Sequence, residues 1–379
     1  MKNIAIIGAS YLQLPLIKKA KDMGLVTHVF AWKANDVGEK EADYFYPISI
    51  IEKDEILNKC KEIGVDGICS IASDLASITV NYVAQNMGLI SNSLECTNKS
   101  TNKHLMRKCF EANGDPSPKS VLINNINDVD LDSFSFPLIV KPTDRSGSRG
   151  ISKVNNKEEL LTAIEHAKEE GFEKNVLVEE YAIGDEYSVE CLSYAGKHTL
   201  LQITKKYTTG SPNFIETGHL EPSLLPKEIQ NKIQEIVFHA LDSLEIKYGA
   251  SHSEIKIDDK GNIKIIEIGA RMGGDLIGSD LVKLTTGIDF VENVIRICLG
   301  EEPKIIGDKN HFDYAGVRFI FNKEDLNILE EMKKNNKELL LEENFDNNIN
   351  ESVSDSSNRH GYFLFGGNDL DTLLKYMPK

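Results

Sequence analysis

The sequence lacks the marks of a secreted, disulfide-stabilised or membrane-spanning protein. Its six cysteines form no CxxC pair and no cluster with histidine, a pattern that favours a reducing compartment over a disulfide framework or a zinc site. No apolar run reaches the length of a transmembrane helix, and the run in residues 1–10 is too short and too weakly basic for a signal peptide. We therefore expect a globular protein of the cytoplasm.

Positive charge is also scarce. The chain of 379 residues carries 43 lysines and arginines against 59 acidic residues, which gives a net charge of −16. An acidic protein repels polyanions, so neither nucleic acid nor an anionic membrane is an expected partner, although a local basic pocket is compatible with this balance. The length is large for a single domain and predicts two or three domains.

Two glycine signatures of nucleotide binding are missing. Strand and helix patterns alternate through the first hundred residues and predict a parallel sheet with crossover helices. The turn after the first strand, at residues 8–15, lacks the spaced glycines of a dinucleotide site, so we interpret this half as a Rossmann-like scaffold rather than an NAD-binding domain. The P-loop pattern GxxxxGK[ST] is absent as well.

Several later segments predict single elements of structure. Residues 99–114 and 280–300 each predict one helix, and residues 224–246 predict an amphipathic helix whose apolar stripe packs in the core. The tail predicts strands at 314–322 and 361–367, with an Asn- and Glu-rich stretch between them that is typical of a loop at 335–358.

The first chemical signal is a loop that follows an apolar run. Residues 136–140 lead to Lys141 and then to "PTDRSGSRG", a stretch rich in glycine, serine and arginine. Small residues let backbone N–H groups approach an anion closely, and Lys141 and Arg149 supply positive charge, so this loop is a candidate phosphate site. An ordinary flexible hairpin with solvated charges is the alternative, and the loop alone does not decide between the two.

The second signal is "SEIKIDDKGNIKIIEIGARMGGD", residues 253–275. Apolar and polar residues alternate on both sides of the turn signal at 258–261, which predicts a β-hairpin. With Lys260 and Gly261 at the centre of the turn, the predicted pairs are Asp258–Ile263, Lys256–Ile265 and Glu254–Glu267. Like charges directly opposite each other are destabilising, but a divalent cation between Glu254 and Glu267 would turn their repulsion into coordination. Glutamates that turn outward into water are the alternative.

An arginine extends this pattern. Arg271 lies four residues past Glu267 and would point to the same face if the strand continued that far. Metal ligands, a cation and a phosphate loop in one chain together favour a nucleoside triphosphate and phosphoryl transfer.

In their order, these motifs resemble the ATP-grasp superfamily. The series Lys103, "VKPTDRSGSRG", "VEEYAIGDEYS" and "HSEIKID…IIEIGAR" is similar to its carboxylate–amine ligase branch, of the L-amino acid or dipeptide type, which is related to the biotin carboxylase and carbamoyl phosphate synthetase cores. The resemblance spans nearly the whole chain and implies an α/β protein with α+β nucleotide-binding lobes. It implies a Rossmann-like domain at 1–97, an ATP-grasp core at 98–300 with a flap at about 120–182, and the C-terminal part of the lobe at 301–379.

The resemblance also implies a role for each motif residue. Lys103 and Lys141 resemble the lysines that hold the phosphates of ATP, and Glu254 and Glu267 resemble the ligands of one or two Mg²⁺ ions, with Mn²⁺ as an alternative metal. Arg271 resembles the catalytic arginine that steadies the transferred phosphoryl group. The flap loop, the hinge that receives adenine and the acid that binds ribose correspond to Ser146, Gly147, Ser148, Arg149, Gly150, Glu179, Glu180, Tyr181, Ala182 and Glu186.

One position departs from the family pattern. The motif usually ends in E-x-N-x-R, but here Gly269 stands where the asparagine would be, so one side-chain ligand of a second magnesium is missing and the number of ions is open. The run "GARMGGD" resembles the variant found in dipeptide-forming ligases, and its glycines leave room for a ligand near the backbone.

The implied reaction has two steps. A carboxylate attacks the γ-phosphate of ATP to give an acyl phosphate and ADP, and an amine then displaces phosphate to form an amide or peptide-like bond. The expected partners are a small carboxylate and a small amine, and a homodimer is common in the resembling families. Candidate substrate contacts are Arg145, Arg149, Thr217, Gly218, His219, His252 and Arg318.

Two other functions stay open. One is an ATP-grasp enzyme that uses bicarbonate, such as a carboxylase or a carbamoyl-phosphate-type enzyme, which the motifs hardly separate from the ligase. The other is a nucleotide-binding regulator that has lost catalysis, which only Gly269 favours. The identities of the acid and the amine do not follow from the motifs, because specificity rests on a few side chains in loops.

Overall fold

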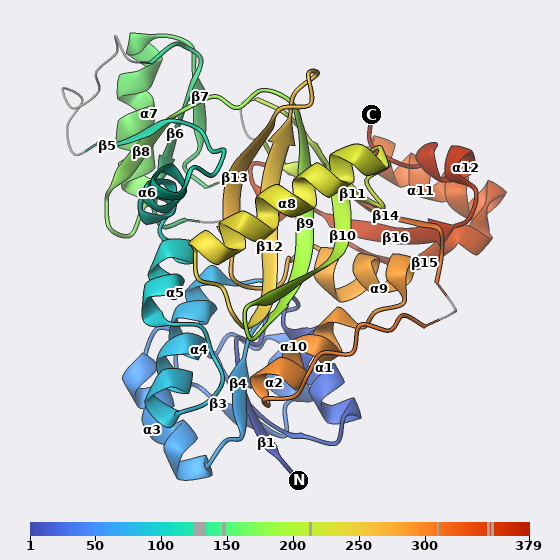
Figure 1. Cartoon of the computed structure of the whole chain (residues 1–379). Coiled ribbons are helices and arrows are strands. Elements are labelled where there is room, and N and C mark those ends of the chain that lie inside the picture. Colours follow the sequence, from blue (N-terminus) through green and yellow to red (C-terminus); the bar gives the residue numbers. More distant parts are fainter. Residues whose placement is uncertain (124–133, 146–148, 212–213, 309–310, 347–348, 350–351) are drawn as a thin grey trace.

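The part of the chain that the structure describes is built around three β-sheets (Figure 1). The structure is a computed structural model that describes residues 1–123, 134–145, 149–211, 214–308, 311–346, 349 and 352–379. Within these residues the sheets have the strand orders β3-β2-β1-β4, β5-β8-β6-β7 and β13-β12-β9-β10-β11-β14-β16-β15. No helix in the described ranges is long and apolar enough to cross a lipid bilayer. The domain boundaries after residues 97 and 300 stay predictions.

The first sheet is parallel, as the sequence predicts. Its strands are β1 (Asn3–Ile7), β2 (Val26–Phe30), β3 (Tyr44–Tyr46) and β4 (Gly67–Cys69), and all of their pairings are parallel. The helices that connect or follow them are α1 (Leu14–Asp22), α2 (Val37–Glu41), α3 (Lys53–Ile63) and α4 (Asp74–Met87). Alternating strand residues such as Ile4 and Ile6 face one core and Ala5 and Ile7 face the other, so both faces of the sheet are covered.

The single helix predicted at 99–114 is wrong, because the chain forms two helices there. They are α5 (Leu94–Thr101) and α6 (Lys103–Asn113). Asn102 between them has an extended backbone, and its side chain accepts hydrogen bonds from the N–H groups of His104 and Leu105. An asparagine that caps one helix cannot continue the previous one, so the break fixes Lys103 as the first, buried residue of α6.

The second sheet is small and antiparallel, and one helix covers it (Figure 1). Its elements are β5 (Ser120–Ile123), β6 (Leu138–Pro142), β7 (Ser152–Val154), α7 (Lys157–Glu170) and β8 (Val176–Glu180). The apolar face of α7 packs its Leu160 and Ile164 against Val140 and Val178 of the strands. Because side chains alternate along a strand, Lys141 points away from this core.

The third sheet holds eight antiparallel strands in the described residues. They are β9 (Asp185–Tyr194), β10 (Lys197–Thr208), β11 (Glu216–Glu221), β12 (Gly249–Ile257), β13 (Ile263–Gly269), β14 (Tyr314–Phe319), β15 (Leu340–Phe345) and β16 (Gly361–Gly367). Helix α8 (Lys227–Ser243) lies across one face, as Figure 1 shows, and buries Ile233, Val237 and Leu241 against it. This confirms the predicted core stripe of the amphipathic helix.

The hairpin of β12 and β13 has a register that the alternation pattern predicts only in part. The turn is closed by the N–H of Gly261 donating to the carbonyl of Asp258, so its centre lies one residue earlier than expected. The observed pairs near the turn are Ile257–Ile263, Lys256–Lys264 and Ile255–Ile265, and the predicted pairs Asp258–Ile263 and Lys256–Ile265 are wrong. A bulge then leaves Ile266 unpaired, and beyond it Glu254 faces Glu267 as predicted.

Two further predictions fail beyond the hairpin. The helix expected at 280–300 is divided into η3 (Ile277–Leu281), α9 (Val282–Thr286) and α10 (Phe290–Cys298), because Gly287 takes a left-handed conformation and Asp289 caps α10. The loop expected at 335–358 contains strand β15. The remaining elements are α11 (Lys323–Asn335), η4 (Lys337–Leu339), η5 (Ser356–Asn358) and α12 (Leu370–Leu374).

Candidate active site

A cavity lies between the small sheet and the large one. The predicted site residues that line it are Lys103, Lys141, Arg145, Glu179, Glu180, Tyr181, Ala182, Glu186, His252, Glu254, Glu267 and Arg271. They come from α6, the small sheet, the segments after β6, β8 and β13, and strands β9, β12 and β13. The fold therefore brings together motifs that lie up to 168 positions apart between Lys103 and Arg271.

Part of the wall of this cavity is apolar. Its lining includes Pro118, Ile139, Ile151, Phe214 and Ile266 together with Tyr181 and Ala182. Tyr181 and Ala182 follow the end of β8, so their backbone groups lie outside the strand ladder. The ring of Tyr181 also contacts the ammonium group of Lys153, 4.0 Å from the ring centre. An apolar surface beside backbone groups that are not paired within a sheet is the kind of environment that binds a ring with polar edges.

The lysine of the phosphate loop is held by a buried carboxylate. Lys141 Nζ lies 2.6 Å from Glu179 Oε2, and Glu179 Oε1 lies 2.7 Å from Arg107 Nε. Burial opposes the charge of Glu179, but Arg107 and Lys141 beside it hold its pKa below the usual range. Burial is also the largest influence on Lys141, and it lowers the pKa of that ammonium despite Glu179. The resemblance gave Glu179 a hinge position, and the sequence did not identify Arg107.

The other predicted lysine joins three segments of chain. Lys103 Nζ donates to Glu267 Oε1 at 2.9 Å and to the carbonyl of Arg145 at 2.8 Å, and its backbone N–H donates to the carbonyl of Thr143. Burial opposes its charge, but Glu267 beside it raises the pKa of Lys103. Lys103, at the start of α6, thus places a positive charge beside Glu267, one of the two facing glutamates.

A lysine that the sequence did not identify lies beside Glu254, the other facing glutamate. Lys206 Nζ on β10 is 2.7 Å from Glu254, 3.0 Å from Glu186 and 3.6 Å from Glu216. Burial opposes its charge, but these three carboxylates raise its pKa well above the ordinary value, and Lys206 in turn holds the pKa of Glu254 well below its ordinary value against the effect of burial. Lys206 faces Glu186 across the β9–β10 ladder, and only that register could have revealed it.

The two facing glutamates, Glu254 and Glu267, fit a magnesium site with few protein ligands. Magnesium is commonly held by one or two carboxylates together with phosphate oxygens. In the described part of the chain, no group of three or more His, Cys, Asp or Glu side chains is arranged to hold a metal. Gly269 offers no third oxygen, and a Cβ there would come within 3.1 Å of both the Arg271 guanidinium and Asp74. The packing of that ion pair is therefore a physical reason for glycine at this position.

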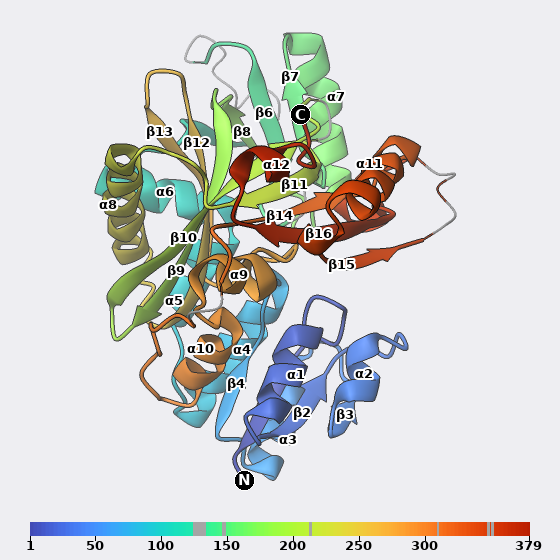
Figure 2. The ribbon, with the colours of Figure 1, turned by 90° about the vertical axis from the view of Figure 1, so that its right-hand side faces the viewer.

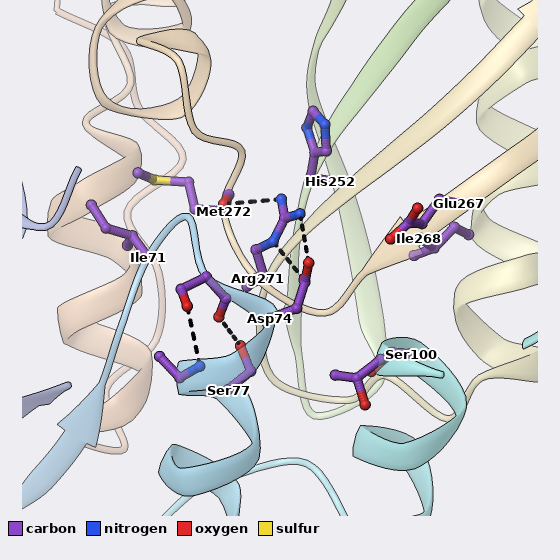
Figure 3. A network of polar contacts seen from close by, with 12 residues as sticks. Ile71, Asp74, Ser77, Ser100, His252, Glu267, Ile268, Arg271 and Met272 are labelled. Atoms are coloured by element: carbon purple, nitrogen blue, oxygen red, sulfur yellow. Dashed lines mark hydrogen bonds and ion pairs between the residues drawn. The ribbon is translucent and has the colours of Figure 1, made fainter. Parts of the chain in front are cut away.

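Arg271 is anchored to the N-terminal sheet domain (Figure 3). Its Nε and one terminal nitrogen donate to the two oxygens of Asp74, at 2.8 and 3.2 Å, and Asp74 is the first residue of α4. Burial opposes the charge of Asp74, but Arg271 keeps its pKa below the usual range. β13 ends at Gly269, so the strand does not continue as far as Arg271, and the condition under which Arg271 would share a strand face with Glu267 is not met. Arg271 reaches the cavity of Glu267 from the loop after the strand.

His252 supports one of the two glutamates. Its Nδ1 lies 2.6 Å from Glu190 Oε1, and its Nε2 lies 3.4 Å from Glu254. Burial lowers the pKa of an imidazole, but Glu190 outweighs this and raises the pKa of His252 to about 9. The ring is therefore positively charged at neutral pH beside Glu254. Its contact with substrate stays a prediction.

A second cavity, which we call the substrate chamber, opens next to the first. His252, Glu254, Glu216 and Arg271 line both cavities. The residues that line the chamber but not the first cavity include Tyr11, Leu12, Asp74, Arg149, Lys206, His219, Asp275, Ser356, Ser357 and Arg359. Its walls thus come from the N-terminal domain, β10 and β11, the loop after β13 and the segment before β16. The sequence identified Arg149 and His219 but not Tyr11, Asp275 or Arg359.

Some predicted residues lie elsewhere. Thr217, Gly218, Gly150 and Arg318 are not among the residues that line the two cavities in the described ranges. The guanidinium of Arg318 donates to Asp325 Oδ1 and to the carbonyls of residues 376 and 377, which gives it structural partners and leaves its substrate contact an unsupported prediction. Ser146, Gly147 and Ser148 lie outside the described residues.

Comparisons with known proteins agree with this geometry. Residues 134–280 match the model of the ATP-grasp domain. Alanine–anticapsin ligase of Bacillus subtilis is 26% identical over 335 residues, which cover 78% of this chain and 70% of that enzyme. D-alanine–D-alanine ligase A of Bacillus cereus is 27% identical over 207 residues, which cover 50% of this chain and 64% of that enzyme.

Solved structures share the fold over almost the whole chain. An L-amino acid ligase from Bacillus licheniformis superposes with a TM-score of 0.82 at 24% identity, covering 99% of this chain and 96% of the other. N5-carboxyaminoimidazole ribonucleotide synthetase in complex with ADP superposes with a TM-score of 0.80 at 16% identity, covering 99% and 95%. These matches confirm the expected α/β class and fold.

Proposed function

Because this chain carries an ATP-grasp domain, we propose that it is an ATP-dependent carboxylate–amine ligase. The relatives at 26% and 27% identity are named as ligases that join alanine to a second compound, which supports a reaction that forms a carbon–nitrogen bond. The products of the proposed reaction are an amide or peptide-like bond, ADP and phosphate. The substrates are a small carboxylate and a small amine.

One observation carries the proposal. Two facing carboxylates, Glu254 and Glu267, and three cations, Lys103, Lys141 and Arg271, line one cavity together with a set of apolar side chains. Lys206 lies 2.7 Å from Glu254. A triphosphate needs positive charge along its oxygens, and its base needs an apolar slot, so the cavity suits a nucleotide that lies along its length. Glu186 lies between Lys206 and Lys256, and we assign it the role of acceptor for a ribose hydroxyl.

Charge compensation is the main work of the site. Lys103 and Lys206 now pair with Glu267 and Glu254, and phosphate oxygens can take over part of that pairing when the nucleotide binds. Magnesium held by Glu254 and Glu267 would neutralise the β- and γ-phosphates. Lys141 reaches the same cavity from β6, where Glu179 fixes its position.

The two chemical steps follow from this arrangement. In the first, a carboxylate oxygen of the substrate bonds to the γ-phosphorus, the bond to the β-phosphate oxygen breaks, and ADP leaves with the electron pair. In the second, the amine nitrogen bonds to the acyl carbon and phosphate leaves, while the nitrogen loses a proton. Arg271 lines both cavities, so we assign it the charge that develops on the phosphoryl and acyl oxygens.

The test is release of phosphate from ATP across an array of amino acids, supplied singly and in pairs, with and without bicarbonate and with and without magnesium. We expect release that needs one acid, one amine and magnesium, and that is lost in Glu267→Gln. Release that needs bicarbonate instead would move the protein to the carboxylating branch. Binding of ATP without release under any condition would contradict the ligase and favour a regulator.

A further inference from the structure

The guanidinium group of Arg271 is held along one edge (Figure 3). Its Nε donates to Asp74 Oδ1 at 2.8 Å, and its Nη2 donates to Asp74 Oδ2 at 3.2 Å. Nη1 makes a longer contact, 3.5 Å, with the carbonyl oxygen of Met272. A guanidinium group has five N–H donors in a rigid plane, so these contacts use three of them. The remaining two, one on each terminal nitrogen, form the outer edge of the group.

This outer edge is the part of Arg271 that a bound molecule can contact. Arg271 lines both the first cavity and the substrate chamber, whereas Asp74 lines the chamber only among these two. Within the described residues, no protein acceptor takes the two N–H groups of the outer edge. They are therefore available as a planar fork for two oxygens of a ligand.

The N-terminal domain holds Asp74 in place beside the loop after β13. Ser73 caps α4, because its hydroxyl oxygen accepts a hydrogen bond from the N–H of Ala76 at 3.2 Å, and Asp74 is the next residue. The N–H of Ala72 donates to the carbonyl of Met272 at 3.2 Å, so the two backbones are bonded next to the ion pair. Ala72 has a φ of +58°, a costly conformation for a residue with a Cβ. Strained residues of this kind cluster at functional sites, and here the strain lies at the entry to α4.

Gly269 makes the close approach of α4 possible. A Cβ at this position would lie 3.1 Å from Asp74 Oδ1, so the carboxylate borders the space into which a side chain at 269 would extend. The side chains of Arg271 and Asp74 are only 15% and 16% exposed. A charge in so buried a place needs a partner, and Asp74 is the partner that the fold supplies.

We propose that Asp74 is a positioning residue for the reaction, which fixes the inner edge of Arg271 so that the outer edge presents two N–H groups to the transferred phosphoryl group and then to the acyl oxygens. The inference rests on the proposed ligase function. It gives the N-terminal domain, whose sequence indicates only a scaffold, a share in the rate that is exerted through α4.

The physical reason is competition for the guanidinium group. Glu267 and Glu254 also attract Arg271, and both line the first cavity. Without Asp74, the flexible side chain would turn its donors toward these carboxylates and would have to be reoriented in each turnover. Donors that already point to the place where charge develops need no such reorganisation, which is why fixed orientation raises the rate.

The experiment compares Asp74→Ala with Ser73→Ala, which removes the cap of α4 and leaves the ion pair. For Asp74→Ala we expect kcat for amide formation to fall by about 100-fold, as for the loss of an oriented donor. The Kd of ATP, measured by calorimetry, should change by less than about threefold, because the interaction is made in the transition state. Ser73→Ala should keep kcat within about twofold. Asp74→Asn keeps the shape of the side chain and replaces the alanine variant if that variant does not fold; its kcat should fall by about tenfold.

Formate provides a readout that a structural role of Asp74 would not move. Asp74→Ala leaves a space beside the inner edge of Arg271, and formate is a free carboxylate of the size to fill it. We expect formate to raise kcat of Asp74→Ala by about tenfold and to leave the unaltered enzyme and Ser73→Ala unchanged. Because formate can itself be activated as a carboxylate, the product measured is the amide of the acid supplied and not phosphate.

The unaltered enzyme separates the two proposals. If it forms no amide with any acid and amine, the ligase function fails, and the role of Asp74 in it fails as well. If it forms an amide and the folded Asp74 variants are equally fast, the ligase stands and the positioning role is overturned. A slow Asp74→Ala enzyme that formate does not restore would also overturn the positioning role, because the carboxylate would then serve the fold of α4 and not the orientation of Arg271.

Discussion

Two glutamates of the large sheet, the fully buried Glu221 and the half-buried Glu254, differ in charge, and their partners stand two residues apart on β10 (Figure 2 shows this sheet from the side). Glu254 accepts a hydrogen bond from Lys206, whereas Glu221, on β11, accepts one from Thr204 at 2.7 Å. Lys206 keeps the pKa of Glu254 well below its ordinary value in spite of burial. Burial raises the pKa of Glu221 to about 8, and the hydroxyls of Thr204 and Thr285 offset this only in part.

The comparison shows that a charged partner can outweigh burial in deciding the charge of a carboxylate in this sheet, whereas hydroxyl partners do not. Thr204 and Lys206 point to the same face of β10, because side chains alternate along a strand. The ammonium group of Lys206 therefore marks a boundary in the sheet. On its side, Glu254 stays ionised and can bind cations; on the side of Thr204, Glu221 stays neutral and has a structural role. Glu221 links β11 to β10 and, through Thr285, to α9.

The largest effect should come from removing the charged partner. We expect Lys206→Met to lower kcat/KM by about 10³-fold, because Glu254 loses the charge that keeps it ionised and the nucleotide loses a cation. Phosphate release with matched melting curves measures this. Lys205→Met is the control, since Lys205 is the next residue of β10, pairs with Asp185 and should change the rate by no more than about twofold. A folded Lys206→Met enzyme of normal rate would remove Lys206 from the site.

The second effect concerns the neutral glutamate and appears as a pH dependence. In the folded protein burial raises the pKa of Glu221 to about 8, so it keeps its proton up to that pH, whereas in the unfolded chain it loses the proton near its ordinary pKa of 4.5. Between these values the unfolded chain binds fewer protons than the folded one, so the free energy of unfolding falls as pH rises, by about 1.4 kcal/mol per pH unit. Glu221→Gln, which cannot ionise, should flatten this slope. Chemical denaturation at pH 5.5, 6.5 and 7.5 compares the slopes, and equal slopes would show that Glu221 is ionised in the fold.

The sequence predicts which residues line the cavity between the small and the large sheet better than it predicts how the strands around that cavity pair. The alternation in residues 253–269 predicts the hairpin and its Glu254–Glu267 pair, but the turn begins one residue earlier and the bulge at Ile266 restores the pair. The isoleucines explain this, because the observed register pairs Ile255 with Ile265 and buries both. A period of two fixes which residues share a face, and it does not fix where a bulge falls.

The residues that the sequence did not identify share one property. Lys206, Asp74, Arg107 and Arg359 carry no local motif, and each meets its partner from another segment of the chain. Only tertiary packing brings them to the cavities. Local patterns could not anticipate the anchoring of Arg271 by a helix of the N-terminal domain.

A smaller effect is expected from adding back the oxygen ligand that the metal site lacks at Gly269. Gly269→Asn restores the oxygen of the E-x-N-x-R pattern, but its Cβ would lie 3.1 Å from the guanidinium of Arg271. We expect kcat/KM to fall by about tenfold, because a shift of this arginine disturbs the reacting groups. Gly269→Ala is the matched control, with the same Cβ and no oxygen, and should lose as much. An asparagine variant faster than the alanine variant would mean that the missing ligand limits the reaction.

The smallest effect concerns the hydroxyl that Glu221 faces. Thr204→Val keeps the shape of the side chain and removes the hydrogen bond to Glu221 Oε1, so a buried oxygen loses its partner. We expect the free energy of unfolding to fall by about 1 kcal/mol. The rate of phosphate release should not change, because Lys206 keeps its contacts with Glu254 and Glu186. Denaturation and rate measurements on the same preparation check both expectations. A loss of rate without a loss of stability would mean that the neutral glutamate serves the reaction, and the boundary that Lys206 marks would then lie farther along β10.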